Sequence, residues 1–178
     1  MFVQLSGVSS KKGSSLSKSP TQSNIFQQLN SFAVKGFGTG LSPWMPGTCG
    51  SLLALLIVYL LSTIELSLSL QMAAVFIFTL LSWYLISVYE ANTHKHDDSQ
   101  VVIDEFAGIF ITFVGITPSV PHFLAGFLLF RLLDITKPFP IGWVDRNVPG
   151  AVGTLFDDVI AGIMACVVLH LFIFQGLL

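Results

Sequence analysis

The chain has 178 residues, of which 53% are hydrophobic and only 10% are charged, and its mean hydropathy is +0.78. This composition is too apolar and too poor in charge for an ordinary soluble domain, so it predicts a small integral membrane protein. Eight basic residues against ten acidic ones give a net charge of −2, which argues against a nucleic-acid partner.

The first thirty residues are rich in serine and lysine, and no acidic residue precedes Glu65. This pattern favours a flexible cytosolic tail over residues 1–30. An organellar transit peptide is an alternative, because such peptides are also serine-rich and acid-poor. A secretory signal is disfavoured because no apolar stretch follows the lysines. Residues 31–178 are expected to form one membrane-embedded domain.

Five apolar segments follow the tail, at residues 49–64, 66–89, 101–116, 122–135 and 154–178. The second and the last are long enough to cross a bilayer core of about 30 Å as helices, and the first also qualifies. The third and fourth are shorter and are separated by "TPSVP", which predicts a short helical hairpin. The fold class is therefore all-α: a small polytopic membrane helix bundle with about four to five membrane helices.

Charge is distributed unevenly between the predicted loops. If the first two segments span the membrane, all eight lysines and arginines fall on one side, and the loops "STIELS" and "TPSVP" on the other side contain none. The positive-inside rule makes the charged side cytoplasmic. Nine of the ten acidic residues share that side, with Glu65 as the exception, so the active site is expected at the cytoplasmic face.

The acidic residues occur in groups at the cytoplasmic ends of the predicted helices. The groups are Asp97 with Asp98, Asp104 with Glu105, Asp134, and Asp157 with Asp158. So many carboxylates around one site repel each other unless a cation is present, and oxygen ligands suit a hard divalent ion such as Mg²⁺. The alternative is that each group only caps a helix and interacts with its dipole.

Basic residues accompany these acids in "FRLLDITKPFPIGWVDRN". Arg131 and Asp134 lie three residues apart on one helical face, and Lys137 precedes the proline that ends the helix. A guanidinium in such an apolar helix needs an anion. That anion is either Asp134, in a structural ion pair, or a phosphate bound by Arg131, Lys137 and Arg146.

A glycine-rich segment, "GFGTGLSPWMPGTCGSL", leads into the first apolar helix. Its glycines and its small hydroxyl residues, which include Thr48 and Ser51, are typical of loops that direct backbone N–H groups toward an anion at a helix N-terminus. It is not a P-loop, because it has no G-x-x-x-x-G-K-[ST] sequence.

Taken together, "GFGTGLSPWMPGTCGSL", "VVIDEFAG", "FRLLDITKPFPIGWVDRN" and "GTLFDDVIAG" resemble the phosphatidylglycerophosphatase A family, in order and over about residues 33–170. The resemblance implies an inner-membrane enzyme of bacterial phospholipid synthesis. Such an enzyme removes the terminal phosphate of phosphatidylglycerophosphate in the presence of Mg²⁺, giving phosphatidylglycerol and inorganic phosphate.

Site residues follow from these motifs. The expected metal ligands are Asp104, Glu105, Asp134, Asp157 and Asp158; the expected catalytic residues are Asp104, Glu105, Arg131, Asp134, Lys137 and Asp158; the expected phosphate-binding residues are Thr48, Ser51, Arg131, Lys137 and Arg146. Asp97 is a secondary candidate, because Asp98 departs from the family pattern at the next position.

Two other functions stay open from the sequence. Acids in membrane helices also mark ion pathways, but a cation transporter would need polar residues across the far half of the bilayer, which is almost uncharged. A noncatalytic lipid-binding protein would use the basic residues alone and would leave the acids unexplained.

Overall fold

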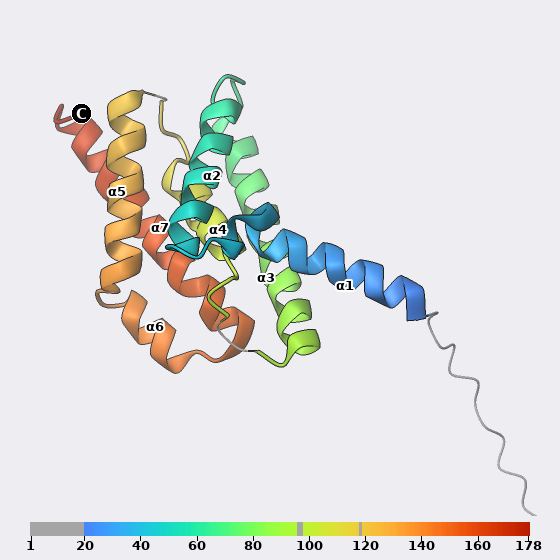
Figure 1. Ribbon diagram of the computed structural model, residues 1–178. Helices are drawn as coiled ribbons and strands as arrows, with labels where there is room; N and C mark the ends of the chain where they lie inside the picture. The colour runs from blue at the N-terminus through green and yellow to red at the C-terminus, as the bar shows by residue number, and fades with distance from the viewer. Residues whose placement is uncertain (1–19, 96–97, 118) are drawn as a thin grey trace, which may run out of the picture.

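The computed structural model describes residues 20–95, 98–117 and 119–178, and every regular element in these ranges is a helix (Figure 1). In chain order they are α1 (Pro20–Val34), the 3-10 helix η1 (Gly36–Leu41), α2 (Pro46–Leu61), α3 (Leu68–Thr93), α4 (Ile103–Thr112), α5 (Val120–Thr136), α6 (Ile141–Asn147) and α7 (Gly150–Phe174). The predicted all-α fold is confirmed for the described residues.

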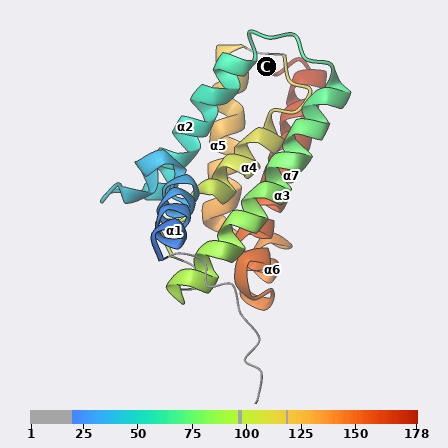
Figure 2. The same cartoon turned by 90° about the vertical axis from the view of Figure 1, so that its right-hand side faces the viewer.

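The short helix α4 forms the centre of the bundle, in contact with α2, α3, α5 and α7 (Figure 2). Most of its side chains are buried, including Phe106 and Ile109. Its acidic residues lie in the first turn, so the centre of the fold brings carboxylates next to the helices that surround them.

Close packing of α4 against α7 depends on two glycines. A Cβ atom at Gly162 would lie 2.4 Å from the carbonyl oxygen of Gly108, and one at Gly108 would lie 2.9 Å from the carbonyl oxygen of Asp158. Small residues at such crossings allow two backbones to approach closely. The approach brings the first turns of α4 and the N-terminal part of α7 to the same place.

Local sequence sets the ends of α5. Ser119 caps its N-terminus by accepting a hydrogen bond from the backbone N–H of His122 at 3.2 Å, with Pro121 in the first turn. At the other end Lys137 adopts a left-handed conformation with φ of 43°, and Pro138 follows. A left-handed residue followed by proline is a common helix stop, and here it fixes the direction of the Lys137 side chain.

Each of the five predicted apolar segments overlaps one helix, although the bounds differ by a few residues. The third helix is shorter than expected, because α4 ends at Thr112. The helices α1, η1 and α6 were not predicted from the sequence. Because α1 begins at Pro20, residues 20–30 are helical, although the sequence analysis places them in the flexible tail.

Two helices, α3 and α7, are long and apolar enough to cross a membrane by length and composition. Their 26 and 25 residues correspond to about 39 Å and 38 Å. The helix α2 is apolar but shorter. These lengths are compatible with a membrane protein.

Candidate active site

Three carboxylates from two helices converge at the centre of the bundle. Asp104 and Glu105 lie in the first turn of α4, and Asp158 lies in α7. One carboxylate oxygen from each lies within 4.8 Å of the others. Asp104 and Asp158 are only 6% and 5% exposed, so water screens their mutual repulsion poorly.

The same carboxylates differ in how their oxygens are used. Asp104 Oδ1 accepts a hydrogen bond from the Glu105 backbone N–H at 3.0 Å, and Asp157 Oδ1 accepts one from the Asp158 N–H, also at 3.0 Å. In contrast, Glu105 Oε2 and Asp158 Oδ1 are buried and have no hydrogen-bond partner. The first member of each pair therefore accepts a hydrogen bond from the backbone of the second, while the second member has a buried oxygen without a partner.

A hard divalent cation fits this donor set. Buried polar atoms without a partner are rare in folded proteins and indicate a ligand or strain. Two such oxygens next to a third carboxylate form an all-oxygen site of the kind that Mg²⁺ or Mn²⁺ uses. Asp104, Glu105 and Asp158 are the residues placed to hold such an ion.

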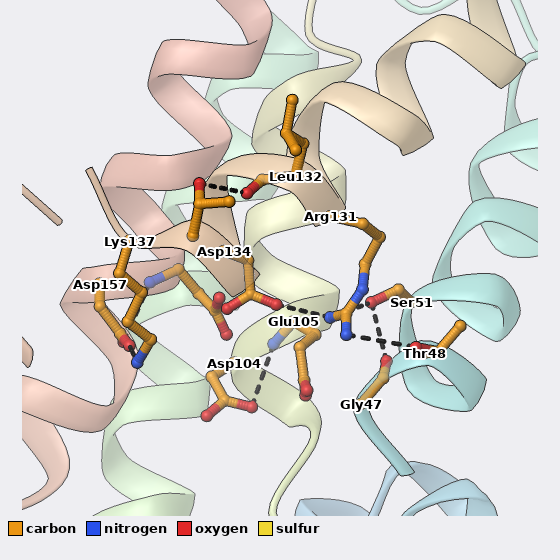
Figure 3. Close-up of polar contacts among 12 residues, drawn as sticks. Gly47, Thr48, Ser51, Asp104, Glu105, Arg131, Leu132, Asp134, Lys137 and Asp157 are labelled. Carbon is orange, nitrogen blue, oxygen red and sulfur yellow. Dashed lines mark hydrogen bonds and ion pairs between the residues drawn. The ribbon is translucent and has the colours of Figure 1, made fainter. Parts of the chain in front are cut away.

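Arg131 of α5 lies beside the acids and connects α5 to α2 (Figure 3). Its Nη1 atom is 2.6 Å from Asp134 Oδ2 and donates to Ser51 Oγ at 3.3 Å, while Nη2 donates to Thr48 Oγ1 at 3.2 Å. Its Nε atom is buried and has no partner. The ion pair with Asp134 is therefore present, and the Nε–H donor is still available.

The first turn of α2 leaves room for the acids because it contains Gly47. A Cβ atom at this position would lie 2.2 Å from Glu105 Oε1 and 3.5 Å from Arg131 Nη1. Glu105 and Arg131 thus approach the α2 backbone at the same point. Part of the glycine-rich segment therefore contributes to the site by the space that Gly47 leaves open.

Asp134 and Asp157 lie next to the group of three but are bound to basic residues. Asp134 is paired with Arg131 and also interacts electrostatically with Asp158. Asp157 is 2.7 Å from Lys137 Nζ. Both were expected as metal ligands, and the structure places each in an ion pair at the edge of the cluster.

Lys137 is the second basic residue beside the cluster, and its ammonium group forms ion pairs with Asp157 and Asp145. Burial alone would lower the pKa of Lys137, but the hydrogen bonds to Asp145 and Asp157 outweigh burial and raise its pKa above the ordinary value. Lys137 therefore stays charged. Sequence reasoning missed Asp145, although it lies eight residues after Lys137 in the same motif.

Among the described residues, Arg146 and Asp98 do not belong to this group of carboxylates. Arg146 is exposed in α6, and the structure records no ion pair for it within the described residues. Asp97 lies outside the described residues. Asp98 accepts hydrogen bonds from the Tyr89 hydroxyl at 2.9 Å and the Gln100 N–H at 3.2 Å, so it structures the loop before α4. Burial would raise the pKa of Asp98, but these bonds and Lys95 lower it.

Comparisons with known proteins cover most of the chain. The sequence profile described as phosphatidylglycerophosphatase A matches residues 32–173. The phosphatidylglycerophosphatase A of Escherichia coli (strain K12) is 40% identical over 136 residues, which are 76% of this chain and 78% of that protein. The protein of the same name from Haemophilus influenzae (strain ATCC 51907 / DSM 11121 / KW20 / Rd) is 41% identical over 148 residues, or 82% of this chain and 88% of that protein.

A third relative has a different name. This protein, from Bacteroides thetaiotaomicron, is provisionally named a phosphatidylinositol-3-phosphatase and is 34% identical over 140 residues, or 75% of this chain and 87% of that protein. No solved structure matches the chain.

Proposed function

Because this chain belongs to the phosphatidylglycerophosphatase A family, we propose that it is a phosphoric monoester hydrolase that removes the terminal phosphate of phosphatidylglycerophosphate. The products are phosphatidylglycerol and inorganic phosphate. The observation that carries the proposal is the buried group of Asp104, Glu105 and Asp158 beside the guanidinium of Arg131. It combines a cation site with an anion-binding group inside the region that the family profile matches.

The proposed cofactor is Mg²⁺, held by Asp104, Glu105 and Asp158. When bound, it would supply positive charge that stabilises the phosphoryl oxygens and activates water. Asp134 and Asp157 border this site, and through their ion pairs they fix the two basic side chains relative to it.

The basic residues are proposed to bind the phosphate. Arg131 is already oriented by Asp134, Thr48 and Ser51, and its Nε–H has no partner. Donors held in place before the reaction stabilise charge developing on the phosphoryl oxygens. Lys137 adds a second positive charge at the same end of the bundle, and exposed Arg146 would attract the anionic headgroup from outside.

Water is the proposed nucleophile. One of Asp104, Glu105 or Asp158 accepts its proton as the new P–O bond forms. The glycerol oxygen leaves as the old P–O bond breaks and takes up that proton, which gives the alcohol and regenerates the carboxylate. The oxygen that takes the proton must differ from the oxygens that hold the cation. Glu105 has the longest of the three side chains and a buried carboxylate oxygen without a partner.

We further propose that residues 31–178 are embedded in the inner membrane by four to five helices, with the site at the cytoplasmic face. The helices α3 and α7 provide the two best spans. Outward-facing side chains on α3 and α5 are apolar over most of their length; they include Leu68, Phe76, Leu80, Leu124 and Leu128. The site is built from the starts of α2 and α4 and the end of α5, as expected for helices that cross in alternating directions.

A phosphate-release assay on the full-length, detergent-purified protein tests the function. The panel contains phosphatidylglycerophosphate, phosphatidylinositol 3-phosphate, phosphatidic acid and a soluble phosphomonoester, each with Mg²⁺ or with EDTA. We expect turnover mainly on phosphatidylglycerophosphate, loss of turnover with EDTA, and loss in Asp134→Asn.

The matched control is Glu65→Gln, which makes the same chemical change in the exposed loop between α2 and α3. Equal turnover of Asp134→Asn and Glu65→Gln would refute the role of Asp134. Faster turnover of phosphatidylinositol 3-phosphate than of phosphatidylglycerophosphate would make the phosphoinositide the substrate and refute the proposed function.

A further inference from the structure

The helix α1 has an apolar face that the rest of the structure leaves uncovered. Ile25, Phe26, Leu29 and Phe32 recur at helical spacing and are all about half exposed or more, with Leu29 at 63%. The exposed side chains continue after α1 with Phe37, Leu41, Trp44 and Met45, and Trp44 is 82% exposed. We call these eight residues the N-terminal apolar surface.

The C-terminal half of α1 is attached to the bundle by specific contacts. Val34 is fully buried, and its carbonyl oxygen accepts a hydrogen bond from the Val102 N–H at 3.1 Å. The Lys35 ammonium lies 5.9 Å from the centre of the Tyr89 ring. Earlier in the helix, Gln27 Nε2 donates to Asn92 Oδ1 at 3.1 Å. The bundle therefore fixes the direction of α1 and directs its apolar face outward.

The direction of α1 differs from that of α2 and α5. It leaves the side of the bundle roughly crosswise to these two helices, at the level where α2 begins (Figure 1). If α2 and α5 cross the bilayer, as in the membrane placement proposed above, a helix crosswise to them at this level runs close to parallel with the membrane surface. Amphipathic helices in this position bury their apolar face about 5–10 Å into the boundary between headgroups and acyl chains.

Composition favours a lipid surface over water or a charged partner. Residues 20–34 contain no charged side chain, so the apolar face has no charged residue on its own helix that would oppose insertion. The apolar surface also continues along the chain into outward-facing Leu52 and Leu56 of α2. A single apolar surface from α1 to α2 would be covered by the same lipid.

We propose that α1 and residues 36–45 lie in the plane of the cytoplasmic bilayer surface, with the N-terminal apolar surface inserted at the level where the acyl chains begin. The inference rests on the membrane placement proposed above. Thr48 and Ser51 follow this surface by one to two helical turns and bind Arg131. The inserted segment thereby sets the depth of the site at the phosphate groups of membrane lipids.

Depth-dependent fluorescence quenching tests this placement. A fluorophore is attached to the full chain through one of three substitutions, Leu29→Cys, Asn24→Cys or Phe76→Cys, in a background with Cys49→Ala and Cys166→Ala. Each labelled protein is reconstituted into vesicles whose lipids carry a nitroxide either near the headgroup or near the end of the acyl chain. Asn24 is exposed and lies about 140° from Leu29 around α1, and Phe76 is an exposed residue of α3.

We expect the label at position 29 to be quenched most by the shallow nitroxide, the label at 24 to be quenched by aqueous iodide, and the label at 76 to be quenched most by the deep nitroxide. Equal access of iodide to positions 29 and 24, with position 76 still deep, overturns the in-plane helix alone. Shielding of position 29 from both nitroxides and from iodide indicates a protein partner and also overturns it. If position 76 is open to iodide, the membrane placement itself fails.

Discussion

Replacing Asp158 by asparagine should stabilise the metal-free protein while abolishing its response to Mg²⁺. The change keeps the size of the side chain but removes one of three buried carboxylates whose oxygens lie within 4.8 Å of one another. Without a cation, the repulsion between these charges opposes folding. The same charges attract and hold a cation when one is present.

The magnitude follows from the geometry. Two unit charges 4.8 Å apart repel each other by about 3.5 kcal/mol at an effective dielectric constant of about 20. Asp158 takes part in two such pairs, so the repulsion is of the order of 7 kcal/mol when all three carboxylates are ionised. Proton uptake by the cluster relieves most of this repulsion, which leaves an expected gain of about 1–3 kcal/mol. For a chain of this size each kcal/mol raises Tm by roughly 2–4 °C.

Thermal unfolding in detergent, followed by tryptophan fluorescence, provides the measurement. In EDTA, Asp158→Asn should melt several degrees above the wild type. With Mg²⁺ at 100 times its Kd, the wild type should gain about 2.7 kcal/mol, whereas Asp158→Asn should gain almost nothing. Glu65→Gln should behave like the wild type in both conditions. A lower Tm of Asp158→Asn in EDTA, or an unchanged Mg²⁺ response, would refute the reasoning.

Three further changes test the surroundings of the cluster. Gly47→Ala would place a Cβ atom 2.2 Å from Glu105 Oε1, so the Mg²⁺ concentration for half-maximal rate should rise although the helix itself tolerates alanine; an unchanged value would contradict the contact. Arg131→Lys keeps the charge but loses hydrogen bonds of about 1.5–3 kcal/mol, so kcat/KM should fall roughly 10- to 100-fold at nearly constant Tm. A kcat/KM equal to that of the wild type would show that the separate N–H groups of the guanidinium are not needed. Lys137→Met leaves the buried Asp157 carboxylate unpaired and should lower the free energy of unfolding by about 2–3 kcal/mol, measured with denaturant. The loss is smaller than for a fully buried pair because 32% of the Lys137 side chain is exposed. Stability restored at acidic pH, where Asp157 is protonated, would support this cause, and stability that stays low would contradict it.

The sequence was informative where one residue type has few physical roles. Adjacent acids in an apolar segment indicated a shared cation, and Asp104, Glu105 and Asp158 do lie together. Spacing on one helical face made Asp134 one of two candidate partners of Arg131, and the contact between them is present at 2.6 Å. In both cases burial of charge leaves few alternatives.

Other features depend on tertiary contacts that spacing does not encode. Adjacent acids point in different directions on a helix, and only the structure separates Asp157, which pairs with Lys137, from Asp158, which has a free oxygen. The proximity of Gly47 to Glu105 joins residues 58 positions apart. The helix α1 was overlooked because its polar composition resembles a tail, although Ile25, Leu29 and Phe32 follow a helical period.

The central claim is that the buried carboxylates hold a divalent cation, and a Mn²⁺ titration followed by electron paramagnetic resonance tests it most directly. The purified wild type and Glu65→Gln should both bind Mn²⁺ saturably, with Mg²⁺ competing for the site. Asp158→Asn and Glu105→Gln, folded as judged by their thermal unfolding, should lose this binding. Saturable binding that survives in both variants, or no saturable binding in the wild type, would contradict the account.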